Sequence, residues 1–177
     1  MADDVPDEID DPFWAVVHRR HPDLDIVLLP PAQPAPDTSG LEPRAPETFA
    51  HEHLAEVDRV WADLVGHGMP LSTARWIPGP THDSVCHTVT LALGGVEESI
   101  ALVHLRAAAE LLAPGRWRVF IPPRGMPRVT ADRDGRLGDE HLLFGYAIEN
   151  RTLFLRLDST GVPVGGRRAQ GLIGDAA

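Results

Sequence analysis

The chain has 177 residues, contains no lysine and has a single cysteine, Cys86. All 16 basic side chains are therefore arginines, a bias typical of a GC-rich bacterium. Without lysine the phosphate-binding motif GxxxxGK cannot occur, and the motifs GxGxxG and GxSxG are missing as well. One cysteine can form neither an intrachain disulfide nor a CxxC metal or redox motif. These absences remove the common signatures of nucleotide binding, serine hydrolysis and thiol redox chemistry.

Long apolar runs are missing too. Stretches such as residues 26–31 are far shorter than the roughly 18 apolar residues that span a bilayer. The sequence starts with acidic residues, where a secretory signal needs positive charge followed by an apolar stretch. We therefore expect no membrane partner and a cytoplasmic location. The hydrophobic share of 43% and the charged share of 24% are those of a globular protein of about one domain.

The formal net charge of −10 is distributed unevenly along the chain. Residues 1–105 hold 18 acidic side chains and 5 arginines, whereas residues 106–177 hold 8 and 11. Such asymmetry indicates either a charged partner or a basic surface that the chain's own acidic segment shields.

The pattern divides the chain into five segments. Residues 1–11 carry six carboxylates and few apolar groups, which predicts a flexible acidic arm. Residues 12–29 are predicted to form a short helix at 12–20 and an extended segment, and residues 30–46, with six prolines, a linker. Residues 47–161 form the predicted core domain, and the glycine-rich residues 162–177 a flexible, frayed tail.

The predicted core is an α+β domain with a mostly antiparallel sheet and two or three helices. Apolar residues at helical spacing indicate a helix over 47–65 that ends at Gly66. Residues 73–77 and 84–93 have strand character, and the second strand alternates apolar residues on one face with threonines on the other. Residues 97–113 fit a helix better than a hairpin strand.

The C-terminal half reads as hairpins. A strand is expected at 117–121, and Asp134-Gly135 should turn residues 129–131 back onto residues 136–137. Asn150-Arg151 should turn residues 141–148 back onto residues 152–157. No internal repeat and no alternation of parallel strands with helices is present, which supports the α+β class.

Two groups of residues could hold a metal or perform catalysis. His51 and His53 lie two apart, so a helix would point them about 200° from each other, and His53 fits the edge of the core better than a metal site. The cluster His82, Asp83, Cys86 and His87 combines imidazole, carboxylate and thiol groups. A strand, however, places Cys86 and His87 on opposite faces. We therefore predict no catalytic residues, no metal and no cofactor.

Other residues suggest binding. Phe13, Trp14 and Val17 would form an apolar face on the short N-terminal helix, suited to a groove on another protein. A second group interleaves arginines with aromatic residues, as in proteins that stack on bases and pair with phosphates, although a solvated strand face is the plainer interpretation. Its members are Arg116, Arg118, Arg124 and Arg128.

The favoured hypothesis is a non-enzymatic protein-binding module, such as an adaptor, a secretion-type chaperone or an immunity-like partner, which could also form a homodimer. It accounts for the missing catalytic motifs, the acidic arm and the proline-rich linker. The first alternative is a small metal- or thiol-dependent enzyme that uses the His82, Asp83, Cys86 and His87 cluster. The second is nucleic-acid binding through the C-terminal arginines, which the acidic overall charge disfavours.

Overall fold

The computed structural model describes residues 16–17, 19–21, 36, 38, 40–66 and 68–174. The chain divides into two units, Met1–Pro34 and Ala35–Ala177. In the first unit Val16, Val17, Arg19 and Arg20 are helical, and the other residues of the helix predicted over 12–20 are not described. The acidic arm, the extended segment 24–29 and residues 30–35, 37 and 39 of the proline-rich linker lie outside the described residues.

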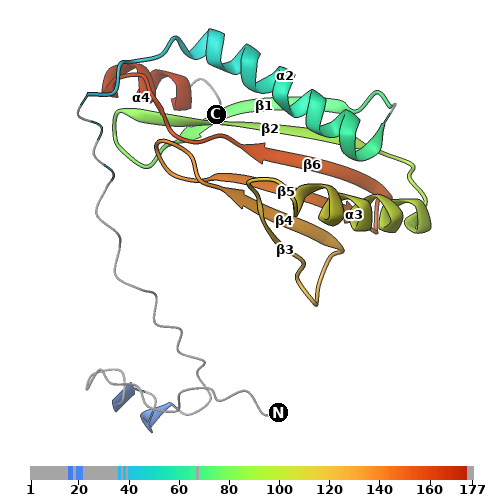
Figure 1. The fold of residues 1–177 in the computed structure, drawn as a ribbon. Helices are drawn as coiled ribbons and strands as arrows, with labels where there is room; N and C mark the ends of the chain where they lie inside the picture. Colours follow the sequence, from blue (N-terminus) through green and yellow to red (C-terminus); the bar gives the residue numbers. More distant parts are fainter. Residues whose placement is uncertain are drawn as a thin grey trace. The chain divides into compact units, whose positions relative to one another are not determined.

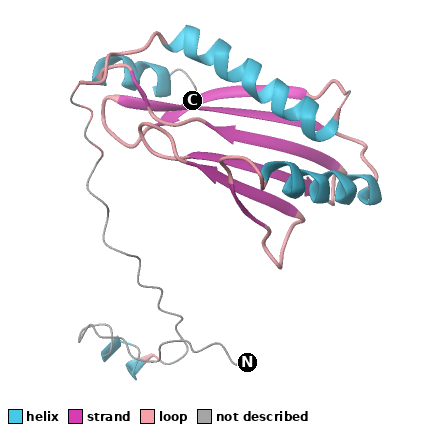
Figure 2. Cartoon of the chain, viewed as in Figure 1, coloured by secondary structure: helices cyan, strands magenta, loops and turns pink. Residues whose placement is uncertain are grey.

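The described residues of the second unit form three helices and seven strands. Figure 2 colours the helices cyan and the strands magenta. The helices are α2 (Pro46–Val65), α3 (Glu98–Leu112) and α4 (Gly166–Gly174). The strands are β1 (Leu71–Pro78), β2 (Ser84–Leu93), β3 (Arg118–Phe120), β4 (Arg128–Arg133), β5 (Glu140–Ala147), β6 (Thr152–Asp158) and β7 (Val162–Pro163).

All strand pairs of the sheet are antiparallel. The strand order is β1-β2-β6-β5-β4-β3, and β7 pairs with one end of β2. The hairpin β1–β2 and the meander β3–β4–β5–β6 are thus joined where β6 lies against β2. The chain crosses between these two halves through α3, as Figure 1 shows.

The helices pack on one face of the sheet (Figure 1). The main core is formed by Val57, Trp61 and Leu64 of α2, the buried face of α3 and alternate residues of β2, β4, β5 and β6. Trp61 is 3% exposed and meets the Phe144 ring edge-on at 6.4 Å between centroids. Because side chains alternate along a strand, the residues between these core positions point to the opposite face.

These observations confirm the predicted α+β class with its mostly antiparallel sheet. The helix expected at 47–65 is α2, and α3 lies within residues 97–113, so the helical interpretation of that segment is correct. The hairpin expected around Asn150-Arg151 is β5–β6, where Arg151 adopts a positive φ of 52°.

The expected turn at Asp134-Gly135 needs correction. β4 pairs with β5, which starts at Glu140, and not with residues 136–137. The connection runs through residues 134–139 and inserts Leu137, 2% exposed, into the domain. Burial of this leucine favours the longer loop over a tight two-residue turn.

The tail expected after residue 161 is partly ordered. β7 pairs with β2, and α4 covers a second, smaller core that contains Val85, Val162, Val164 and Ala169. This order depends on tertiary burial, which local composition does not reveal. Residues 175–177 lie outside the described part of the chain.

No helix in the described part of the chain is both long enough and apolar enough to span a membrane.

Candidate functional site

One face of the sheet carries no helix from the described residues of the second unit. The strand registers place six polar residues in one row across this open face, one from each strand, because directly paired residues of neighbouring strands share a face. From β1 to β3 the row consists of Arg75, Thr88, Asp158, His141, Asp132 and Arg118.

Most of the charged side chains in this polar row already form hydrogen bonds with other side chains. His141 Nδ1 lies 2.6 Å from the carboxylate of Asp132. Arg118 donates hydrogen bonds to Asp134 at 2.5 Å and to Asp139 at 2.8 Å. Arg75, by contrast, is exposed and has no acidic partner within 4 Å among the described residues.

Arg156 stands beside this row, near the middle of the open face. Its Nε and Nη2 atoms each donate a hydrogen bond of 2.9 Å to the Asp158 carboxylate. Hollows lie on both sides of Arg156. One, of about 470 Å³, extends toward β4 and includes Arg128, Thr130 and His141.

The second hollow, of about 340 Å³, is lined almost entirely by arginine and threonine. It lies over β1, β2 and β6 and is lined by Thr73, Ala74, Arg75, Thr88, Thr90 and Arg156. Thr88 is 3% exposed, and its hydroxyl has no hydrogen-bond partner among the described residues. Hydroxyls and guanidinium groups are donors, so this hollow suits an anionic or hydrogen-bond-accepting group.

The charge of the domain is polarised between its two sides. The open face carries four arginines, Arg75, Arg118, Arg128 and Arg156, and two aspartates, Asp132 and Asp158. Helix α2, on the other side, carries five acidic residues and one arginine. The strands of the open face therefore carry more arginines than aspartates, although the protein as a whole is acidic and Asp134 and Asp139 also reach Arg118 there.

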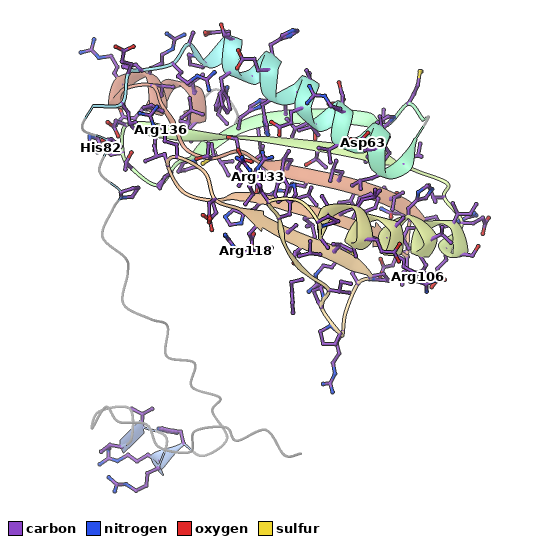
Figure 3. The ribbon with its side chains drawn as sticks, viewed as in Figure 1. Asp63, His82, Arg106, Arg118, Arg133 and Arg136 are labelled. Atoms are coloured by element: carbon purple, nitrogen blue, oxygen red, sulfur yellow. The ribbon has the colours of Figure 1, made fainter. Side chains whose placement is uncertain are left out.

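An apolar hollow of about 400 Å³ lies on the helix-covered side of the domain, between α3 and the segment that follows β3. Leu102, Ala109, Ile121 and Pro127 contribute to it, and Leu102 and Ile121 are 41% and 58% exposed. Arg106, labelled in Figure 3, and Glu110 stand on its rim. Exposed apolar groups next to a hollow are typical of protein contact surfaces.

The predicted binding residues fall in different places. Phe13 and Trp14 lie outside the described residues, and Val17 belongs to the first unit. Arg118 and Arg128 share the open face, at opposite ends of the β3–β4 hairpin and about 14 Å apart at 3.4 Å per residue. Arg116 and Arg124 are exposed in the segments that flank β3.

The structure does not bring His82, Asp83, Cys86 and His87 together. Cys86 faces the open side, where burial and the nearby Asp158 raise its pKa to about 11. His87 is buried on the helix side, and His82 is exposed at the end of the domain near α4 (Figure 3). Among the described residues, no group of three or more His, Cys, Asp or Glu side chains is placed to hold a metal ion.

The structure instead pairs His87 with His53, a contact that sequence reasoning missed. Their Nδ1 atoms lie 3.0 Å apart, and both rings are buried between α2 and β2. Burial, with a smaller effect of His87, lowers the pKa of His53 to about 4, and burial also lowers the pKa of His87. Both rings are therefore neutral at pH 7, and one Nδ1 donates a hydrogen bond to the other.

Comparisons with protein-family models, with curated proteins and with solved structures yield no match to this chain.

Proposed function

We propose that the chain is a non-enzymatic protein-binding module, of the kind that serves as an adaptor, a secretion-type chaperone or an immunity-like partner, and that its partner binds on the open face of the sheet. The observation that carries this proposal is that face itself. Six strands present a row of polar side chains there, and Arg75 has no acidic partner among the described residues.

The chemistry of the open face favours binding over catalysis. Asp132 and Asp158 already bond to His141 and Arg156, so neither carboxylate is free to act as a general base. Cys86, with its raised pKa, is a thiol and not a nucleophilic thiolate at neutral pH. A nucleophile and an oriented base within hydrogen-bond reach, which covalent catalysis needs, are not found together on this face of the described chain.

The test is recovery of a partner from the native host with the full chain as bait. The variant Arg75→Glu reverses the charge of an exposed residue on the open face. The control Arg59→Glu makes the same charge change at an exposed position of α2. We expect a stoichiometric protein with the wild-type chain and with Arg59→Glu, and its loss with Arg75→Glu. Absence of any stoichiometric protein, or equal recovery with both variants, would contradict the proposal.

A second candidate is binding of single-stranded nucleic acid. Phe120 is 60% exposed on the same face as the arginines, and exposed aromatic rings beside arginines are what bases stack on. Two of the four arginines on this face are already engaged by aspartates, which weakens this alternative. Binding of a labelled oligonucleotide that falls steeply with salt would favour it.

A further inference from the structure

The outer edge of β1 is an unpaired strand edge in the described part of the chain. β1 ends the strand order of the sheet, and its residues 71–75 are all exposed. The opposite edge is formed by β3, which has only three residues and whose Arg118 is engaged by two aspartates. Long exposed edges invite pairing with another chain, and natural proteins usually protect them.

Two backbone hydrogen bonds show which groups of β1 point outward. The N–H of Gly79 donates to the Ser84 carbonyl across the β1–β2 hairpin, and the N–H of Ser159 donates to the His87 carbonyl between β6 and β2. Bonded and non-bonded residue pairs alternate in an antiparallel ladder. The bonded pairs of β1 with β2 are therefore those at the odd positions of β1, and Ser72 and Ala74 turn their N–H and C=O groups away from the sheet.

The side chains next to this edge indicate what would pair with it. Thr73 and Arg75 face the open side, where Arg75 has no acidic partner among the described residues. The threonines of the 340 Å³ hollow continue this donor surface toward the sheet interior, whereas Arg156 there is already bonded to Asp158. Ser72 and Ala74 face the helix side and are small and exposed.

We propose that the partner contributes an extended acidic segment, which adds to the sheet as an antiparallel strand along β1 and places carboxylates over Arg75 on the open face. This inference rests on the proposed function and names the chemistry of the partner. Backbone hydrogen bonds to Ser72 and Ala74 supply affinity, and alternate side chains supply specificity, as in other cases of strand addition.

The register makes the proposal specific. Partner residues opposite Ser72 and Ala74 form bonded pairs with β1, so their N–H groups point to β1 and their side chains to the helix side. Partner residues opposite Thr73 and Arg75 point their side chains to the open face and their N–H groups outward. Carboxylates therefore belong on the residues whose N–H groups do not bond to β1.

The probe is a labelled, blocked seven-residue peptide of alternating valine and glutamate, titrated into the full chain. Two further peptides have methyl groups on backbone nitrogens. One peptide carries them on two valines, and the other carries them on two glutamates. We expect the parent peptide and the glutamate-methylated peptide to bind, and the valine-methylated peptide to lose binding. Equal binding of the two methylated peptides would show that charge alone acts, which overturns strand addition.

Protein variants test the role of Arg75. Arg75→Glu replaces an attraction with a repulsion and should weaken peptide binding about tenfold, which corresponds to about 1.4 kcal/mol. Arg59→Glu, the matched change on α2, should leave it unchanged. A peptide with arginine in place of glutamate should bind more weakly than the parent; tighter binding would contradict the proposed charge complementarity.

Failure of this inference is distinguishable from failure of the proposed function. If the host partner is recovered and lost with Arg75→Glu, but no alternating acidic peptide binds, the module binds a partner without an added acidic strand. Self-association through β1, seen as a dimer in sedimentation that Ala74→Pro breaks, would assign the edge to a second copy and overturn the inference.

Discussion

The two faces of the sheet are built from the same strands and yet differ in almost every property. On β6, Leu153, Leu155 and Leu157 are at most 1% exposed and pack under the helices. Arg156, between Leu155 and Leu157, and Asp158, after Leu157, face the open side and form an ion pair. Burial of the first set stabilises the domain by the hydrophobic effect, whereas surface ion pairs contribute little. The comparison therefore separates a face that maintains the fold from a face that is free to bind.

The largest expected effect is on the helix-covered face. Trp61→Ala should lower the free energy of unfolding by about 3–5 kcal/mol, because it leaves a cavity between α2 and Phe144. Chemical denaturation measures this change. An unchanged midpoint would mean that the α2 interface is not part of the stabilising core.

The buried histidine pair should make stability depend on pH. The pKa of His53 is lowered to about 4 in the fold, so between pH 6.5 and about 4 the unfolded chain binds more protons. This contribution is fully present above pH 6.5 and is lost as the pH falls to about 4, at a cost of about 3 kcal/mol. Glu56, Asp158 and Arg133 act on His53 as well, with smaller effects.

The measurement is denaturation across this pH range for the wild type and for His53→Phe, which cannot take up the proton. The variant should show a shallower loss of stability in acid. Parallel curves for the two proteins would show that protonation of His53 is not what destabilises the fold.

A smaller effect is expected at the edge of the core, where Arg133 pairs with Glu56 and Glu140 and lies over the Trp117 ring at 4.6 Å. Arg133→Met keeps the aliphatic packing but leaves Glu140, only 18% exposed, without its partner. Arg133→Met should lower the free energy of unfolding by about 1–3 kcal/mol. The matched change Arg59→Met, at an exposed position of α2, should lower it by less than about 0.5 kcal/mol. Equal effects in thermal unfolding would contradict the structural role of this ion pair.

The smallest effect on stability is expected on the open face. Arg75→Glu should change the free energy of unfolding by less than about 0.5 kcal/mol, because Arg75 is exposed and has no acidic partner among the described residues. The same variant should lose the partner. A destabilisation like that of Arg133→Met would mean that Arg75 belongs to the fold and that the two faces are not separate in function.

Periodicity within a segment predicted much of the helix-covered face. The spacing of Val57, Trp61 and Leu64 defined α2, and the alternation of valines and threonines in residues 84–93 defined β2 and its two faces. Such patterns are local, so a single sequence shows them.

The open face could not be predicted in the same way, because it depends on register between strands. Arg75, Thr88 and Asp158 are neighbours only when β1, β2 and β6 pair as they do, and these residues lie up to 83 positions apart. The His53–His87 contact depends in the same way on how α2 packs on β2. The threonines of β2 were the one local signal that this strand has a polar face.

Amide hydrogen exchange of β1, followed residue by residue by NMR, tests the central claim most directly. In the free protein the amides of Thr73 and Arg75, bonded to β2, should exchange slowly, and those of Ser72 and Ala74 should exchange fast. Addition of the partner, or of the valine–glutamate peptide, should slow exchange at Ser72 and Ala74. Unchanged exchange along β1, with new protection on α3 instead, would place the binding surface at the apolar hollow and contradict the account.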